Sequence, residues 1–246
     1  MMMLNYAPAR ASTLRQFSLL LLIHSTLSIY HTIFCMPTAY RGVSYLDQVV
    51  QSYHSQNIFR MDGVTLAVLD TDNSTYGRYT RLLKRVQADC RQEEIEGKPS
   101  CKVRQQGLDV SSAMTQCANF TSGWVVLTED DCEACTGALD EVVTTLSMLD
   151  REEIAIAKFS KFVRATAFPS HMVPHYVDSV LHRLNDFPYD VTVIEEWAVG
   201  RKQYIHHRNL FHHIGFVSTE ARRNDPAYRA EYAQLRGDNC FENLRV

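Results

Sequence analysis

The sequence predicts an α/β fold with a central, mostly parallel sheet, placed behind a single N-terminal membrane anchor. Two patterns support this fold class: short apolar runs alternate with stretches of helical spacing from residue 63 onwards, and an uncharged run precedes them. Hydrophobic residues make up 46% of the 246 residues and charged residues 22%, as in ordinary folded domains. The net charge of -3, from 25 Lys and Arg against 28 Asp and Glu, argues against a nucleic-acid binder, which normally carries a basic excess.

Residues 17–34 contain no Lys, Arg, Asp or Glu over 18 positions, and Arg10 and Arg15 precede them. As a helix this run is about 27 Å long, close to the roughly 30 Å of a hydrocarbon core. Basic residues on its N-terminal side favour a cytosolic N-terminus and a lumenal remainder. Because His24 and His31 interrupt the apolar character, a cleaved signal peptide and a buried helix are alternatives to an anchor. The expected organisation is a cytosolic lead over 1–16, a signal-anchor helix over 17–35, a stem over 36–58 and a folded domain over 59–246.

Seven cysteines occur in the chain, and six of them lie beyond the expected anchor. Glycosylation sequons at Asn73 and Asn119 agree with a domain that faces an oxidising lumen, where six cysteines can form up to three disulfides. The Cys132-Glu-Ala-Cys135 motif is then expected to contribute to disulfides, within the motif or with other cysteines. The alternative is a zinc site shared with histidines, although a structural zinc site takes four ligands and the chain has one CxxC.

The expected strands and helices alternate along the folded domain. Apolar runs bounded by turn residues predict strands, and apolar residues at every third or fourth position predict helices. The polar stretch 90–110 is expected to form a surface loop closed by a Cys90–Cys101 disulfide. The strands are expected within 63–71, 124–128, 153–160 and 202–205, with an intervening segment at 165–170, and the helices within 79–89, 111–120, 133–149 and around 177–184.

Three consecutive carboxylates, Glu129, Asp130 and Asp131, directly follow the strand expected at 124–128. Such a group is costly at the end of a buried strand unless something satisfies its charge, and a divalent cation does so. In open α/β sheets ligands bind at the carboxyl ends of the strands, so a metal ion with a nucleotide diphosphate is expected here. The equally weighted alternative is a solvated loop in which Asp130 or Asp131 caps the next helix.

Four of the ten histidines lie within eight residues, and this cluster follows the edge strand expected at 202–205. Imidazole is a good ligand for manganese-type and zinc-type ions, so one of these rings is a candidate ligand. The alternative is that the rings are packed or exposed without a ligand, as most histidines are. The cluster comprises His206, His207, His212 and His213.

Further carboxylates occur at Asp190, Glu195 and Glu196, in a stretch that starts like a helix. A carboxylate in a partly desolvated site can act as a general base. For each of these residues the competing interpretation is a solvated helix face.

Several motifs together resemble the Golgi GT-A glycosyltransferases related to N-acetylglucosaminyltransferase IV, and equally the post-GPI-attachment GalNAc transferase. They are VVLTEDD, the later KFS, PYD-VTVIEEW and NLFHHIGFVST, and the resemblance covers about residues 124–219. It implies that Asp131 touches the metal and that Glu129 and Asp130 contact the ribose or the cation. It also implies that His213 is a second protein ligand of Mn²⁺, and that Asp190 or Glu195 deprotonates the acceptor.

The resemblance implies a GT-A-like catalytic domain in the Golgi lumen behind the membrane anchor. The expected activity is metal-dependent, inverting transfer of a HexNAc unit from a UDP-sugar to a glycan acceptor, with GalNAc transfer to a GPI-anchor mannose as the first expectation. The alternatives are GlcNAc transfer to an N-glycan mannose, and a non-catalytic lumenal relative of the fold. The expected partners are therefore a UDP-HexNAc donor, a glycan or GPI acceptor and the membrane, and no nucleic acid.

Overall fold

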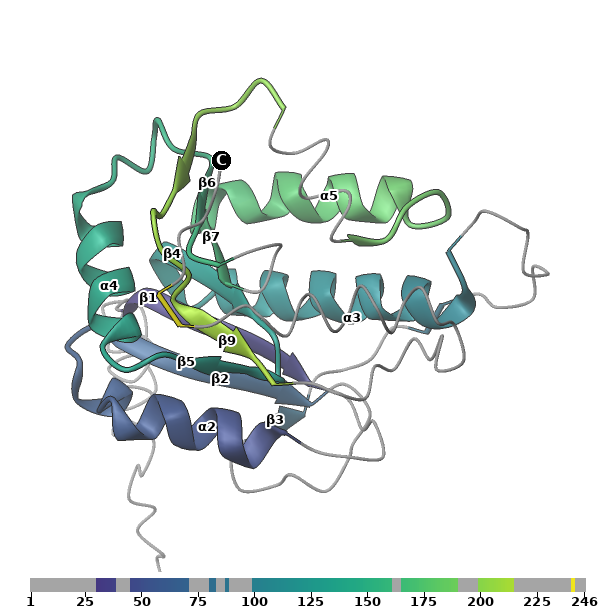
Figure 1. The fold of residues 1–246 in the computed structure, drawn as a ribbon. Coiled ribbons are helices and arrows are strands. Elements are labelled where there is room, and N and C mark those ends of the chain that lie inside the picture. The colour runs from purple at the N-terminus through teal and green to yellow at the C-terminus, as the bar shows by residue number, and fades with distance from the viewer. Residues whose placement is uncertain are drawn as a thin grey trace, which may run out of the picture.

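The computed structural model describes residues 30–38, 45–70, 80–82, 87–88, 99–160, 165–189, 199–214 and 240–241. These residues form a seven-stranded sheet flanked by helices and a separate two-stranded sheet (Figure 1). The strands are β1 (Tyr30–Thr38), β2 (Val64–Asp70), β3 (Thr80–Leu82), β4 (Thr121–Thr128), β5 (Cys132–Ala134), β6 (Ile156–Lys158), β7 (Ala165–Pro169), β8 (Gln203–Ile205) and β9 (Phe211–His213). The helices are α2 (Leu46–Ser55), α3 (Cys101–Ala118), α4 (Ala138–Met148) and α5 (Val173–Arg183), with short 3-10 turns at Ile58–Arg60 and Ser170–Met172.

The large sheet has the strand order β3-β2-β1-β4-β7-β6-β8. Strand β7 is antiparallel to both of its neighbours, whereas the other strands share one direction. Strands β5 and β9 pair antiparallel in the small sheet. The predicted α/β class with a mostly parallel sheet is therefore confirmed.

Two hydrophobic cores lie on opposite faces of the large sheet, because successive side chains of a strand point in opposite directions. Along β1, Phe34 and Met36 join the core shared with α2 and α4, while Ile33 and Cys35 join the core shared with α3 and α5. Figure 1 shows these two helix pairs on either side of the sheet. The result is a three-layer α/β/α arrangement in which β1 and β4 are covered on both faces.

Strand β1 corrects the expected division of the N-terminal part. It overlaps the end of the anchor predicted over 17–35, and α2 lies wholly within the stem predicted over 36–58. The folded domain thus includes residues that were assigned to the anchor and the stem. A strand that is buried on both faces is as free of charged residues as a membrane span is, so the length of the uncharged run does not distinguish the two. Residues 17–29 lie outside the described residues, and within the described ones no helix has the length and apolar character needed to cross a bilayer.

Helix α3 differs from the loop predicted over 90–110, because it begins at Cys101. Its first turn is capped by Ser100, whose side chain accepts a hydrogen bond from the Val103 amide at 3.4 Å. Polar residues such as Arg104 and Asp109 are buried on its inner face and mask the apolar stripe. Two smaller differences concern the segment 80–82, which is a strand rather than part of a helix, and the segment 132–134, which is a strand before α4 begins.

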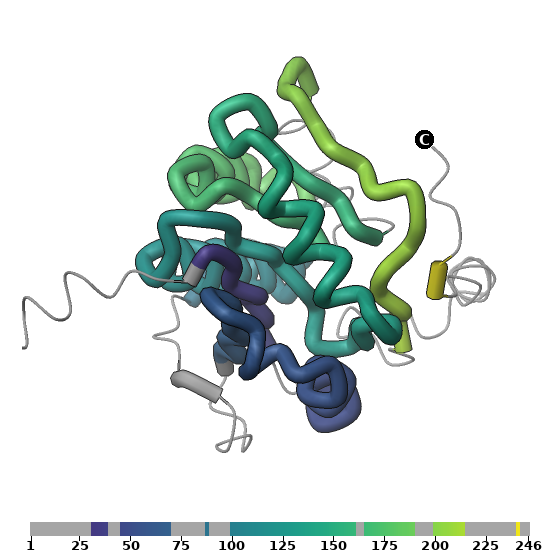
Figure 2. Tube along the Cα trace, turned by 90° about the vertical axis from the view of Figure 1, so that its left-hand side faces the viewer, coloured from purple at the N-terminus to yellow at the C-terminus, as the bar shows by residue number. Residues whose placement is uncertain are grey.

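Disulfides connect distant parts of the chain. Cys35 in β1 is bonded to Cys117 in α3, and Cys135 is bonded to Cys240. Cys101 is also disulfide-bonded, while its predicted partner Cys90 lies outside the described residues. The backbone amide of Phe241 donates to the Asn209 carbonyl at 2.7 Å, and Figure 2 shows the segment 240–241 near the segment 199–214. The zinc alternative that required both Cys132 and Cys135 as ligands is wrong, because the sulfur of Cys135 is in a disulfide.

Glycine is required at position 123, where β4 passes close to the start of β1. A Cβ atom added to Gly123 would lie 1.9 Å from the carbonyl oxygen of His31, which is backbone and cannot rotate away. We expect Gly123→Ala to destabilise the fold by about 3 kcal/mol, because β1 and β4 would have to separate. Urea unfolding of this variant, with Ser122→Ala at the neighbouring exposed position as control, measures the loss. Equal stability of both variants would show that β1 shifts without cost.

Candidate metal and nucleotide site

The carboxyl ends of β1 and β4 meet where the strand order changes direction. From β1 the order proceeds through β2 to β3 on one side, whereas β4 pairs with the opposite edge of β1. Such a switch point is where open α/β sheets bind their ligands. The hydroxyl of Thr38, at the end of β1, donates to Oδ2 of Asp130 at 2.6 Å. The acidic triplet therefore lies at the ligand-binding edge of the sheet.

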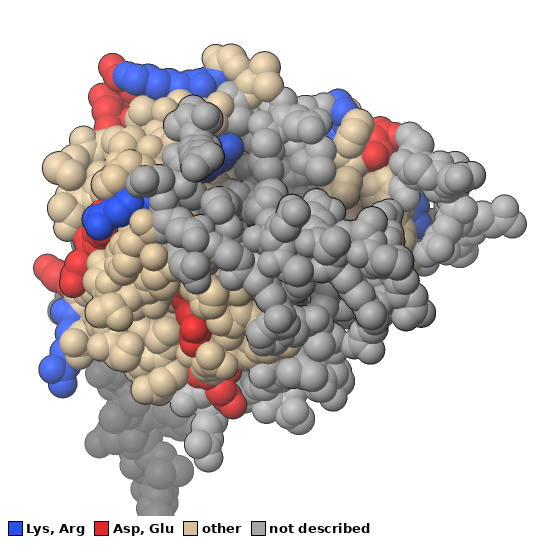
Figure 3. All heavy atoms as spheres, viewed as in Figure 1, with Lys and Arg blue, Asp and Glu red and all other residues tan. Residues whose placement is uncertain are grey.

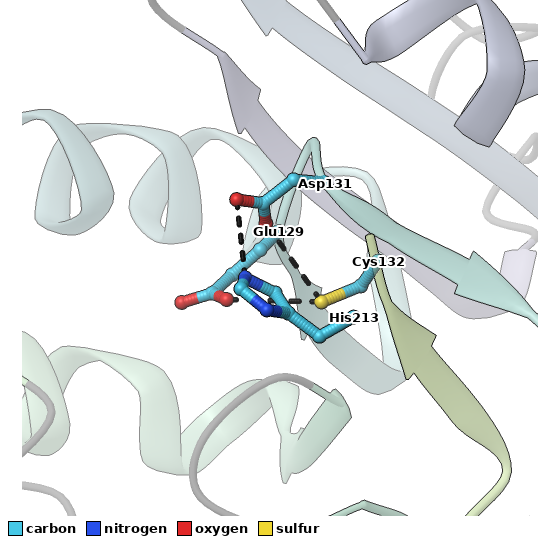
Figure 4. Close-up of side chains that lie close together, drawn as sticks. All are labelled: Glu129, Asp131, Cys132 and His213. Carbon is cyan, nitrogen blue, oxygen red and sulfur yellow. Dashed lines mark hydrogen bonds and ion pairs between the residues drawn. The ribbon is translucent and has the colours of Figure 1, made fainter. Parts of the chain in front are cut away.

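Strands β5 and β9 bring a histidine to this edge. Their antiparallel register places His213 opposite Cys132, and the amide of Ile214 donates to the Asp131 carbonyl at 2.9 Å. Nε2 of His213 lies 3.2 Å from Oδ2 of Asp131 (Figure 4). The two candidate metal ligands, Asp131 and His213, are thus side by side although they are far apart in the sequence.

Four donor atoms gather at one point: a carboxylate oxygen of Glu129, one of Asp131, the sulfur of Cys132 and a ring nitrogen of His213. All lie within 4.8 Å of one another. The Cys132 sulfur is 3.7 Å from Oε2 of Glu129 and 3.9 Å from Oδ1 of Asp131 (Figure 4). Asp131 is only 4% exposed, so its charge is shielded from water and calls for a partner. Oxygen, nitrogen and sulfur donors at these separations fit a divalent transition-metal ion.

Two hydroxyl groups hold the other carboxylates of the triplet. Tyr189 donates from its hydroxyl to Oε1 of Glu129 at 3.2 Å, and Thr38 donates to Asp130 as described above. Asp130 is 5% exposed. Both contacts fix the direction of a carboxylate at the carboxyl end of β4. Neither Thr38 nor Tyr189 was a candidate from the sequence: the first fell in the expected stem, and the second precedes Asp190 without a distinguishing pattern.

Helix α2 supports β5 from behind. Oγ of Ser52 accepts a hydrogen bond from the Ala134 amide at 3.1 Å, and Nε2 of Gln56 donates to the Ala134 carbonyl at 3.0 Å. Oε1 of Gln56 also accepts from the Leu139 amide at 3.3 Å, which ties α2 to the start of α4. These contacts fix the short β5 strand, and with it the position of Cys132.

Tyr53 of α2 is fully buried next to this site, and it packs against the rings of Phe34 and Phe211. Burial raises the pKa of its phenol above the usual value of about 10, and the charge that the Cys132 thiol can carry adds to the rise. The nearby Thr128 hydroxyl lowers the pKa of Tyr53 in part. Among the described residues, however, neither the Tyr53 hydroxyl nor the Thr128 hydroxyl has a partner with hydrogen-bond geometry. The phenol of Tyr53 is therefore held neutral.

Replacing Tyr53 by Phe is expected to stabilise the fold by about 1 kcal/mol at neutral pH, because it removes a buried hydroxyl without a partner. The raised pKa adds a pH dependence: its contribution to stability is complete below about pH 10 and is lost as the pH rises further, since only the unfolded state then ionises. The wild-type chain should therefore lose more stability than Tyr53→Phe between neutral pH and about pH 10.5, as urea unfolding at the two values will measure. Parallel losses in both proteins would contradict the neutral, buried phenol.

The other members of the histidine cluster take different positions. His206 is buried, and its Nε2 lies 3.1 Å from Oε1 of Glu141 in α4, an oxygen that also accepts from Arg208 at 2.8 Å. His207 is exposed, and His212 is opposite Glu133 in the small sheet. Of the four rings, the structure brings His213 alone into the metal-ligand cluster of the described residues. The candidate bases Asp190 and Glu195 lie outside the described residues.

Charged side chains elsewhere on the described surface are mixed in sign. Figure 3 shows acidic and basic groups interspersed on the visible face, in agreement with the small net charge. An ion pair between Lys202 and Glu153 is one such contact, and both side chains are largely exposed. Pairs of this kind add little stability because water screens them.

The chain matches no family model, and no curated protein matches it. Solved structures show a distant likeness, and three of them illustrate it. The galactosyltransferase LgtC, in complex with donor and acceptor sugar analogues, is 9% identical with a TM-score of 0.44, and the match covers 72% of this chain and 73% of that one. The mannosyltransferase PcManGT from Pyrobaculum calidifontis, in complex with GDP-Man and Mn²⁺, is 16% identical with a TM-score of 0.41, covering 85% and 62%.

The third is a glycosyltransferase involved in the glycosylation of the major capsid of PBCV-1, at 11% identity and a TM-score of 0.45, covering 83% of this chain and 98% of that one. At such identities and TM-scores, these likenesses carry no inference about activity. The function has to be inferred from the site itself.

Proposed function

We propose that this chain is a metal-dependent glycosyltransferase that uses a nucleotide-sugar donor. The observation that supports it most is the convergence of Glu129, Asp131 and His213 at the carboxyl ends of the strands where the sheet order changes direction. This position suits a nucleotide diphosphate together with a divalent cation, because the carboxylates and the imidazole can hold the cation. The resemblance of the acidic triplet and of the NLFHHIG segment to Golgi GT-A enzymes supports the same activity.

The residues of the site have separate roles in this proposal. Asp131 and His213 would hold the cation, with Glu129 beside them, while the Asp130 carboxylate, which is not part of this cluster, is held by the Thr38 hydroxyl. A bound divalent cation would supply positive charge for the diphosphate that leaves when the anomeric C–O bond breaks. Tyr189 fixes the direction of the Glu129 carboxylate.

The finer assignment rests on the sequence resemblance. It is inverting transfer of a HexNAc unit from a UDP-sugar, with GalNAc transfer to a GPI-anchor mannose favoured and GlcNAc transfer to an N-glycan mannose as the alternative. Asp190 or Glu195 accepts the proton of the acceptor hydroxyl while the new glycosidic bond forms and the bond to the diphosphate breaks. We place the enzyme in the Golgi membrane with its catalytic domain in the lumen, where disulfides such as Cys35–Cys117 form.

A donor and acceptor screen tests the activity. The full chain, produced with its disulfides intact, is incubated with Mn²⁺ and either UDP-GalNAc, UDP-GlcNAc or GDP-mannose. The acceptors are a GPI glycan and an N-glycan, and the readouts are released nucleoside diphosphate and the mass of the acceptor. We expect one UDP-HexNAc to be consumed, with loss of activity on addition of EDTA.

Different outcomes separate the coarse and the fine assignment. Transfer from GDP-mannose alone would reject the HexNAc donor and keep the glycosyltransferase. Manganese-dependent binding of UDP by calorimetry without any transfer would favour a non-catalytic relative that has kept the site. No binding of UDP or GDP with Mn²⁺ and no turnover of any donor would reject the proposed function.

A further inference from the structure

Cys132 is the cysteine that keeps a thiol among the described residues. The other described cysteines, Cys35, Cys101, Cys117, Cys135 and Cys240, are all in disulfides. The thiol is fully buried, and the β5–β9 register places it directly opposite His213. A reduced sulfur thus lies inside a carboxylate and imidazole cluster in a chain that otherwise oxidises its described cysteines.

The spacing of the donor atoms fits a common metal ion. In a tetrahedral site, metal–sulfur bonds of about 2.3 Å and metal–oxygen bonds of about 2.1 Å place sulfur and oxygen about 3.6 Å apart. The sulfur of Cys132 is 3.7 Å from Oε2 of Glu129 and 3.9 Å from Oδ1 of Asp131. For oxygen and nitrogen the same geometry gives about 3.4 Å, and Nε2 of His213 is 3.2 Å from Oδ2 of Asp131. Asp131 thus approaches the sulfur through Oδ1 and the ring nitrogen through Oδ2, and the other separations among the four donor atoms, which reach at most 4.8 Å, have to shorten for all four to surround one ion.

A second feature points to a built site around the sulfur. The hydroxyl of Tyr53 is fully buried and close enough to the thiol of Cys132 to interact with it electrostatically, and among the described residues it has no partner with hydrogen-bond geometry. Buried polar groups normally have partners, so a buried hydroxyl without one beside a cluster of ligands indicates a place for a polar or ionic occupant. Ser52 of α2 and Gln56, which follows the helix, hold the backbone of β5 and thereby fix the position of the Cys132 backbone in the site.

We propose that Cys132 is a direct ligand of the cation, so that a sulfur atom joins Glu129, Asp131 and His213 in the site. The thiol proton passes to solvent as the metal–sulfur bond forms. Because thiolate selects softer ions, the site prefers Zn²⁺, Co²⁺ and Cd²⁺, with Mn²⁺ next, over Mg²⁺ and Ca²⁺. This inference rests on the proposed function, since it specifies the cation of the same site.

Cobalt spectroscopy tests the sulfur ligand without any turnover. The purified full chain is titrated with Co²⁺, alone and with UDP, and a near-ultraviolet absorption from sulfur-to-cobalt charge transfer is recorded. The expected result is that the wild-type chain shows this band, while Cys132→Ser binds Co²⁺ by calorimetry without it. The wild-type chain should bind Cd²⁺ more tightly than Mg²⁺, and this preference, measured as the dissociation constant for Mg²⁺ divided by that for Cd²⁺, should fall by about 10-fold or more in Cys132→Ser. Loss of a residue that only supports a metal ligand already lowers metal affinity by about 10-fold, so loss of a direct ligand should have at least this effect.

Controls keep the two proposals distinguishable. Thermal unfolding and the calorimetric Co²⁺ stoichiometry show whether Cys132→Ser retains the fold and the site, and Cys132→Ala is the second variant if Ser is not tolerated. Wild-type binding of Co²⁺ without the charge-transfer band, or a band that persists in a folded Cys132 variant, overturns the sulfur ligand and leaves the glycosyltransferase intact. No Co²⁺ binding under either condition overturns both.

Discussion

Replacing Asp131 by Asn is expected to lower the rate of sugar transfer by about 10³-fold while the fold is kept, because the site loses the charge that holds the cation. The side chain of Asp131 is 6% exposed and faces His213, so water cannot replace the missing carboxylate. Its backbone contact survives the change, since the Asp131 carbonyl, which accepts from the Ile214 amide, is untouched. The measurements are donor turnover with Mn²⁺ and calorimetric Mn²⁺ binding in the presence of UDP.

Asp140→Asn is the matched control for this prediction. Asp140 lies in the first turn of α4, where it is exposed and outside the metal-ligand cluster, so the same Asp-to-Asn substitution there changes the charge without touching the site. We expect wild-type turnover from this control and an unchanged melting temperature in both variants within a few degrees. Normal UDP-HexNAc turnover by a folded Asp131→Asn chain would remove Asp131 from the catalytic machinery and with it the assignment of the site.

The acidic triplet could be located from the sequence because its signal is local. The apolar run at 124–127 in β4 is followed, after Thr128, by three carboxylates, and this run and its end follow from hydrophobicity, whereas the strand itself begins earlier, at Thr121. The same holds for β2, whose apolar residues end at Asp70. The carboxyl end of a buried strand therefore predicts where polar chemistry begins, without any knowledge of the neighbouring strands.

The remainder of the site depends on pairings that sequence periodicity does not contain. Thr38 meets Asp130 only because β1 pairs with β4, and β1 was hidden in an uncharged run that also suits a membrane helix. Among four candidate histidines, the antiparallel register of β5 and β9 selects His213, and a shift by one residue would present His212 instead. The role of Cys132 likewise follows from this register and not from the CxxC motif.

The second large effect concerns stability: joint replacement of Cys35 and Cys117 by Ala is expected to cost about 4 kcal/mol. A cross-link between residues 82 apart in sequence lowers the conformational entropy of the unfolded chain, and in the chain-entropy account this stabilises the folded state by about 4 kcal/mol. Typical domains have only about 5–15 kcal/mol of stability, so the loss is a large fraction of the total. Urea unfolding of the double variant under non-reducing conditions measures it, with Cys132→Ser as a control that leaves the disulfides in place.

The position of this disulfide extends its effect to the ligand-binding edge of the sheet. Cys35 lies in β1 three residues before Thr38, and the bond ties the strand to α3 through Cys117. Both cysteines are buried in the core shared with α3 and α5, so their removal also leaves β1 less firmly packed. We therefore expect the double variant to bind Mn²⁺ with UDP more weakly at temperatures below its unfolding transition. An unchanged free energy of unfolding would contradict this prediction, because the packing of β1 on both faces would then stabilise the strand without the disulfide.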